Sequence, residues 1–184
     1  MARAVLEARA ALTIRMAPSQ VVTRADTMLR MVSQGFRDMG EADEDRVLLG
    51  FLGVVVFGRS MTLVMQNLRT YDREAFERWH EPWQEEMKGD PLMLYFYKLR
   101  TMVVHKDAPA IGSVLAATGK SAPPIGSITV DDLPPPDGHL GEPIDDTSMG
   151  NLCRLYLAYP ERMFESFHQV AFAVQDRPIA AEGL

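Results

Sequence analysis

The sequence has too few cysteines to form a disulfide or zinc framework. Its one cysteine, Cys153, has no second cysteine for an internal disulfide and leaves no Cys-x-x-Cys pair for zinc. This composition fits a reducing compartment, and we predict a cytoplasmic protein. Because Cys153 falls in an apolar helical pattern, we expect a small buried side chain, with a nucleophile as the remote alternative.

An excess of positive charge and a long hydrophobic run are also absent. The chain has 19 Lys and Arg against 25 Asp and Glu, a net charge of −6. This balance argues against a strongly basic nucleic-acid binder, although it leaves room for a local basic pocket. The longest apolar run, residues 47–58, is shorter than the roughly 20 residues of a membrane-spanning helix. We therefore expect a core helix there and no membrane contact.

The sequence lacks the motifs of the common enzyme classes. It contains no phosphate-binding glycine loop, no His-Glu-x-x-His pair and no Gly-x-Ser-x-Gly elbow. His80 has no second ligand-type residue at a convincing spacing. We accordingly predict neither a metal site nor a cofactor.

What is present is the composition of one folded domain rich in helix-forming patterns. The 184 residues are 47% hydrophobic and 24% charged, close to the globular average. Apolar residues recur at helical spacing in five segments, over residues 20–39, 41–68, 71–88 (in two parts around Pro82), 91–106 and 147–175. The sequence predicts an all-α bundle of four to five helices over residues 20–184, preceded by an N-terminal arm over residues 1–19.

A proline- and glycine-rich insertion, residues 107–146, interrupts the helical pattern before the last helix. Its prolines exclude a long helix. Residues 113–118 and 127–130 could pair as a short β-hairpin, and His139 is expected to be exposed. A loop of this length is typical of a functional flap, a partner-binding loop or a mobile segment.

Two features of the predicted helix over residues 41–68 concern packing and polarity. Its glycines, Gly50, Gly53 and Gly58, would permit close approach of another backbone, and we interpret them as packing positions. A polar stripe runs along the same helix at steps of three and four residues, formed by Arg59, Thr62, Gln66 and Arg69. The stripe is either a solvated edge or the wall of a crevice.

One short pattern carries chemistry. Arg100 precedes His105 by five positions, and His105 falls in the last turn of the helix that begins after Asp90, its expected N-cap. The negative end of the helix dipole favours the imidazolium form of a histidine there, and such a residue can exchange protons. The two positions are about 140° apart around an ideal helix. They can serve one site only if the last turn unwinds or a partner subunit completes it.

This Arg-x4-His pattern at the end of a bundle helix resembles the HEPN family of small all-α proteins. Arg59-Ser60 in an apolar helix, residues 76–83, and Asp90-Pro91 ahead of the motif strengthen the resemblance, which covers roughly residues 44–106. Thr101 stands where the family usually has Asn or Asp.

The resemblance implies a homodimeric, metal-independent endoribonuclease of a toxin or defence system, in which two copies of the motif form one cleft. His105 would be the general acid or base, and Arg100 would stabilise charge on the phosphate. We assign substrate binding to Arg59, Gln66 and Thr101.

Two other functions stay open. The bundle and its insertion could form a noncatalytic scaffold or protein-interaction module that binds an antitoxin or another protein, which the acidic charge favours. Alternatively, Arg59, Gln66 and the aromatic residues could line a small-ligand pocket.

Overall fold

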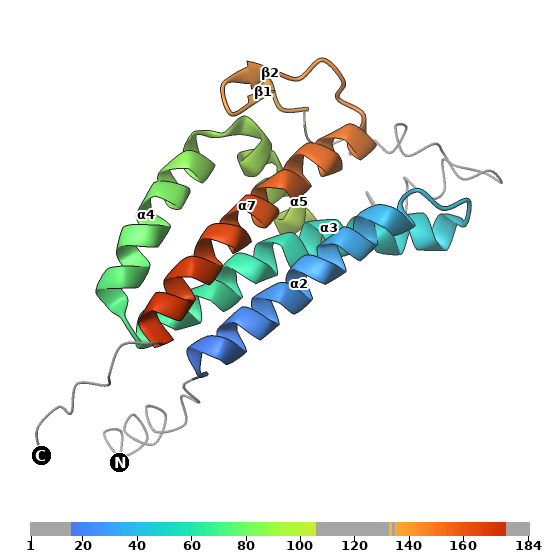
Figure 1. Ribbon diagram of the computed structural model, residues 1–184. Coiled ribbons are helices and arrows are strands. Elements are labelled where there is room, and N and C mark those ends of the chain that lie inside the picture. The colour runs from blue at the N-terminus through green and yellow to red at the C-terminus, as the bar shows by residue number, and fades with distance from the viewer. Residues whose placement is uncertain (1–15, 106–132, 134, 176–184) are drawn as a thin grey trace, which may run out of the picture.

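The computed structural model describes residues 16–105, 133 and 135–175. Within these ranges the chain forms five α-helices, one 3-10 segment and one β-hairpin (Figure 1). They are α2 (Pro18–Asp38), α3 (Glu44–Met65), η1 (Gln66–Thr70), α4 (Arg73–Gly89), α5 (Pro91–His105), β1 (Gly138–His139), β2 (Glu142–Pro143) and α7 (Met149–Gln175). The predicted all-α bundle is confirmed, as is a short hairpin before the C-terminal helix.

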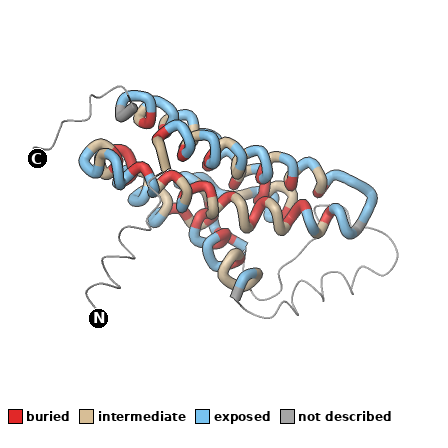
Figure 2. Tube along the Cα trace, turned by 90° about the horizontal axis from the view of Figure 1, so that it is seen from below, coloured by how far each residue is buried: buried red, intermediate tan, exposed pale blue. Residues whose placement is uncertain are grey.

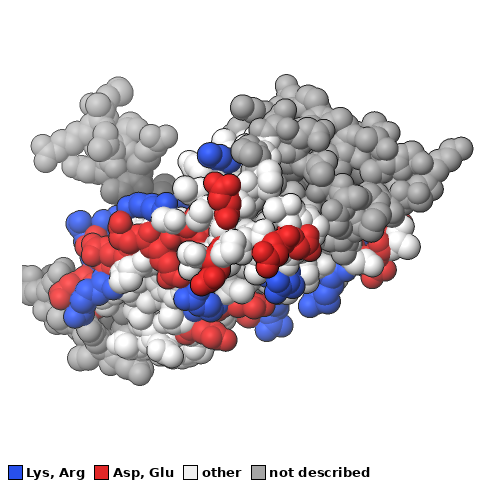
Figure 3. All heavy atoms as spheres, turned by 90° about the horizontal axis from the view of Figure 1, so that it is seen from above, with Lys and Arg blue, Asp and Glu red and all other residues white. Residues whose placement is uncertain are grey.

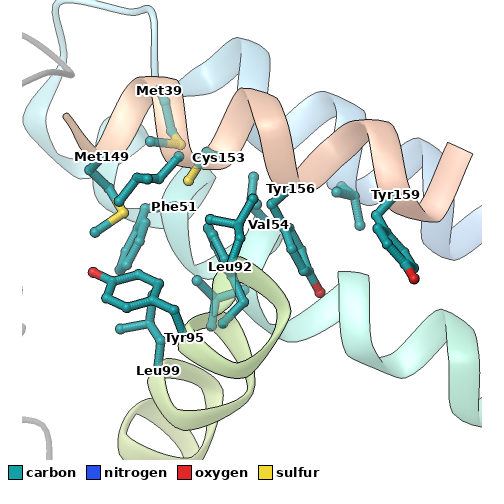
Figure 4. Close-up of a cluster of buried hydrophobic side chains, with 14 of the residues drawn as sticks. Met39, Phe51, Val54, Leu92, Tyr95, Leu99, Met149, Cys153, Tyr156 and Tyr159 are labelled. Carbon is teal, nitrogen blue, oxygen red and sulfur yellow. The ribbon is translucent and has the colours of Figure 1, made fainter. Parts of the chain in front are cut away.

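The helices pack around two clusters of buried side chains. α2 and α3 lie side by side along most of their length, and α7 packs against α2, α3 and α4. One cluster joins the second half of α2, α3, α5 and the first half of α7, and ten of its residues, Cys153 among them, are labelled in Figure 4. The second joins α2, the end of α3, η1, α4 and the second half of α7. Buried residues follow the inner sides of the helices (Figure 2), so amphipathic patterning determines the packing.

Two glycines bring the backbones of α2 and α3 together. A Cβ added at Gly35 would lie 2.5 Å from the carbonyl oxygen of Gly50, and a Cβ at Gly50 would meet the Gly35 carbonyl in return. No real side chain fits at such a distance. The interpretation of Gly50 as a packing position is therefore confirmed, and its partner is Gly35.

Aspartates begin three of the helices. The Asp43 carboxylate accepts a hydrogen bond from the Arg46 amide (3.0 Å), and that of Asp72 accepts one from the Ala75 amide (2.8 Å). Asp90 begins α5 in the same way, as expected from its position before Pro91. Short acidic side chains at helix N-termini satisfy amides that have no partner within the helix.

Two expectations from the sequence are wrong. α4 runs unbroken through Pro82, because Pro82 and Arg78 are both exposed and water can reach the Arg78 carbonyl that loses its helical partner. His139 is largely buried, with 12% of its side chain exposed, because it packs beside Asp90. The hairpin pairs His139 with Glu142. The pairing expected between residues 113–118 and 127–130 lies outside the described residues.

The apolar helix α3 passes a length and composition test for membrane spans together with η1, over Asp45–Thr70. In its most apolar stretch, 44% of the residues are buried inside the bundle. Val47, Phe51 and Val54 are among the buried positions and belong to the core cluster shared with α5 and α7. This burial is what the interpretation of residues 47–58 as a core helix requires.

Replacing Gly50 by alanine should lower the free energy of unfolding by about 1–3 kcal/mol, because the new methyl group must push α2 and α3 apart. Gly89→Ala is the matched control, since nothing lies within 4 Å of a Cβ at Gly89. Urea denaturation of both variants measures the difference. Equal stabilities for the two variants would show that the α2–α3 contact tolerates a side chain.

Candidate functional site

The buried carboxylate of Asp90 positions the helix that carries the Arg-x4-His motif. Its Oδ1 accepts hydrogen bonds from the amides of Leu92 (2.8 Å) and Met93 (3.1 Å). Its Oδ2 accepts one from the Leu140 amide (2.6 Å) and lies 2.8 Å from Nδ1 of His139. One side chain, 3% exposed, therefore joins the start of α5 to the β-hairpin. The sequence pattern predicted the cap but not the link to the hairpin.

At the other end of α5, Arg100 is a half-buried cation that has no ion-pair partner among the described residues. Its Nε is buried and has no hydrogen bond, and no carboxylate of the described residues lies within ion-pair distance of the guanidinium. The Thr101 hydroxyl donates to the Tyr97 carbonyl (3.0 Å). His105 is the last residue of α5 in the described part of the chain, and its side chain lies outside that part.

A face of α5 near the motif exposes apolar side chains. Leu94, Tyr97 and Val104 are 44%, 57% and 44% exposed. With Thr101 they share one face of the helix, at about 100° per residue. Positions 100 and 105 flank this face on opposite sides. A partner protein packed on this face would therefore border both motif positions.

Arg59 lies elsewhere, in a pocket between α3, α4, α5 and α7. The pocket has a volume of about 280 Å³, and its walls include Arg59, Thr62, Phe96, Tyr97, Tyr156 and Tyr159. The pocket combines Arg59 with aromatic residues, as in the small-ligand alternative, but that alternative also included Gln66. Gln66 and Arg100 do not line it, and neither does Thr101. Gln66 instead begins η1, so the structure does not bring the three predicted substrate-binding residues together.

The polar stripe on α3 faces this pocket in part. Nη1 of Arg59 donates to the Thr62 hydroxyl (3.1 Å), which in turn donates to the Arg59 carbonyl (2.8 Å). Thr62 is buried, whereas Arg69 is exposed and pairs with Glu77. Arg59 and Thr62 therefore form part of a crevice wall, whereas Arg69 lies on a solvated edge.

Two tyrosines of α7 contribute buried hydroxyls that the sequence analysis missed. Burial raises the pKa of both Tyr156 and Tyr159, while the nearby Arg59 opposes the rise at Tyr156. Within the described part of the chain, the Tyr159 hydroxyl has no hydrogen-bond partner of good geometry. Their spacing of three residues places both on one side of α7, the signal that could have identified them (Figure 4).

His80 is a buried residue of α4, and its surroundings favour the neutral imidazole. Its ring stacks on Phe76 with centroids 4.8 Å apart, and it is 7% exposed. Burial lowers its pKa, and the positive charges of Arg59 and Arg69 lower it further. A buried, stacked imidazole with a lowered pKa is a structural residue here.

The depressed pKa of His80 makes stability depend on pH. Below the ordinary histidine pKa of about 6.5, the unfolded chain takes up a proton at His80 that the folded chain does not, so stability falls as pH falls through this window. His80→Gln should lose less stability than the wild type between about pH 7.5 and pH 5.5. The exposed His168 provides the control, His168→Gln, and chemical denaturation at both pH values is the measurement. Equal losses in wild type and His80→Gln would contradict the assignment.

Comparison with known proteins gives no relative for this chain. No protein-family model matches the chain, and neither a curated protein nor a solved structure is significantly similar to it. The resemblance to the HEPN family therefore rests on the motif residues themselves, and function is inferred from the arrangement of side chains.

Proposed function

We propose that this protein is a HEPN-like, metal-independent endoribonuclease that acts as a homodimer through Arg100 and His105. The observation that carries the proposal is the half-buried guanidinium of Arg100, five residues before His105. Its Nε is buried and has no hydrogen-bond partner among the described residues. A buried donor without a partner is costly in a folded protein. A phosphate oxygen would satisfy it.

In the proposed reaction a ribose 2′-oxygen attacks the adjacent phosphorus and displaces the 5′-oxygen of the next nucleotide. His105 takes the proton from the 2′-hydroxyl or gives one to the leaving oxygen. Arg100 stabilises the negative charge that builds on the phosphate. The products are a 2′,3′-cyclic phosphate and a free 5′-hydroxyl.

The exposed face of α5 supports dimerisation as part of this proposal. Leu94, Tyr97 and Val104 expose apolar surface that a second copy would cover. A two-fold axis that lies in this interface and runs parallel to α5 would set Arg100 of each copy on the same side as position 105 of the other, because the two positions flank the face on opposite sides. In such a dimer Arg100 of one copy and His105 of the other would form one site, although the two residues are about 140° apart on one helix.

A noncatalytic scaffold or protein-interaction module is the second candidate, and surface charge favours it. The face in Figure 3 carries many acidic side chains interspersed with basic ones and no continuous basic surface. The net charge of −6 would repel RNA phosphates. On this alternative the α5 face would bind another protein, such as an antitoxin, and loss of His105 would leave that binding intact.

Cleavage of single-stranded RNA in EDTA tests the ribonuclease. His105→Ala should reduce the rate by about 10²–10⁴-fold and Arg100→Gln by about 10²–10³-fold, without lowering the melting temperature. Arg154→Gln is the control, because Arg154 is exposed and bonds only to the Asn151 side chain. Products are examined for the 2′,3′-cyclic phosphate. Absence of cleavage, or equal cleavage by wild type and His105→Ala, favours the scaffold.

The shared site has its own test. Val104→Glu should yield a monomer with reduced cleavage, because a carboxylate on the α5 face opposes its burial against a second copy. Mixing the Arg100→Gln and His105→Ala proteins should restore part of the lost activity, since mixed dimers contain one intact pair. Light scattering gives the oligomeric state. A monomeric wild type, or mixtures as inactive as each variant alone, would rule out a site shared between subunits.

A further inference from the structure

The pocket between α3, α4, α5 and α7 is built by specific packing. A Cβ at Gly58 would lie 2.6 Å from the ring of Tyr156, so only glycine lets this ring reach α3. The opposite face of Tyr156 stacks on Phe96, with centroids 4.0 Å apart and planes at 11°. Tyr159 packs edge-on against Trp83 at 5.5 Å. The walls are therefore held in place by rings in contact with three helices.

Cationic and hydroxyl groups provide the polar part of the pocket lining. Arg59 contributes a half-buried guanidinium that bonds to Thr62 and has no carboxylate of the described residues within ion-pair distance. Lys88 lies at the exposed rim, where Glu85 pairs with it. None of the described residues that line the pocket is acidic. An anionic group is the ligand chemistry that such a lining stabilises.

The Tyr159 hydroxyl is a second, independent sign of a ligand. The residue is 3% exposed and lines the pocket, and its hydroxyl has no hydrogen-bond partner of good geometry among the described residues. Tyr156 and Tyr159 project from α7 in the same direction (Figure 4). Burial and the neighbouring carboxylates of Glu86 and Asp90 raise the pKa of Tyr159, but Glu86 is close to the hydroxyl without a hydrogen bond of good geometry and is itself paired with Arg162 (3.3 Å). A protonated tyrosine with a free donor can bind an acceptor oxygen of a ligand.

The rest of the lining is apolar and adaptable. Met87, Met93 and Met163 contribute flexible thioethers, and Phe96 contributes a ring face. At about 280 Å³ the pocket lies near the small end of ligand sites, which bury an apolar body and orient it with a few polar groups. The exposed Gln84 and Tyr97 at the rim leave a path to solvent.

We infer that this pocket binds a small amphipathic organic anion, a carboxylate with an apolar tail. The carboxylate pairs with Arg59 and accepts a hydrogen bond from the Tyr159 hydroxyl, while the tail lies among the methionines. The inference is independent of the proposed ribonuclease, because Arg100 and Thr101 do not line this pocket.

Calorimetric titration of the full chain with octanoate tests the inference. Octanoate should bind, whereas octan-1-ol and octylammonium, which have the same tail but a neutral or cationic head, should bind at least about tenfold more weakly. Arg59→Gln should weaken octanoate binding by about tenfold or more and leave octan-1-ol binding unchanged. Tyr159→Phe should also weaken octanoate binding, and Arg154→Gln should not change it.

The outcomes separate charge recognition from simple burial of a tail. No octanoate binding by the wild type overturns the inference. Equal affinity for octanoate and octan-1-ol, or for wild type and Arg59→Gln, also overturns it, because the anion then contributes nothing. Should Arg59→Gln fail to fold, as circular dichroism would reveal, Tyr159→Phe applies the same criterion.

Discussion

The rest of the bundle depends on two glycines of α3, because neither has a side chain to hold its neighbour away. At Gly50 the helix meets the backbone of α2, and at Gly58 it meets the ring of Tyr156 from α7. Close approach at both points lets a mainly apolar helix lie between its neighbours. Arg59 follows Gly58 directly, so the contact that places the Tyr156 ring also places the guanidinium beside it.

α5 links the two candidate sites without merging them. Its first half lines the pocket through Met93, Phe96 and Tyr97, and its last turns carry the Arg-x4-His pattern. Asp90 anchors the helix start to the hairpin, so the insertion, at least in its described part, contributes to the placement of α5. Leu94 and Tyr97 belong both to the pocket rim and to the exposed apolar face. A partner on that face would therefore also border the mouth of the pocket.

Charge distinguishes the proposed RNA site at Arg100 from the proposed small-anion site at Arg59. The overall acidity opposes general attraction of RNA, so any phosphate contact must come from local cations such as Arg100. Arg59 is a second local cation, but it lies among aromatic and thioether side chains. That environment suits the head of a small anion with an apolar tail better than a solvated polynucleotide backbone.

The sequence by itself determined the helices, because apolar spacing, aspartate caps and chain-breaking residues act over a few neighbours. It predicted α2 to within two residues at its N-terminus, the start of α5 and the burial of Cys153. It also identified Arg59 as a candidate for a crevice. Only the tertiary structure decided that Pro82 leaves α4 intact, that His139 packs beside Asp90, and that Gln66 lies apart from Arg59. These outcomes depend on which helices pack together and on which groups water reaches. The spacing of residues along the chain specifies neither of these.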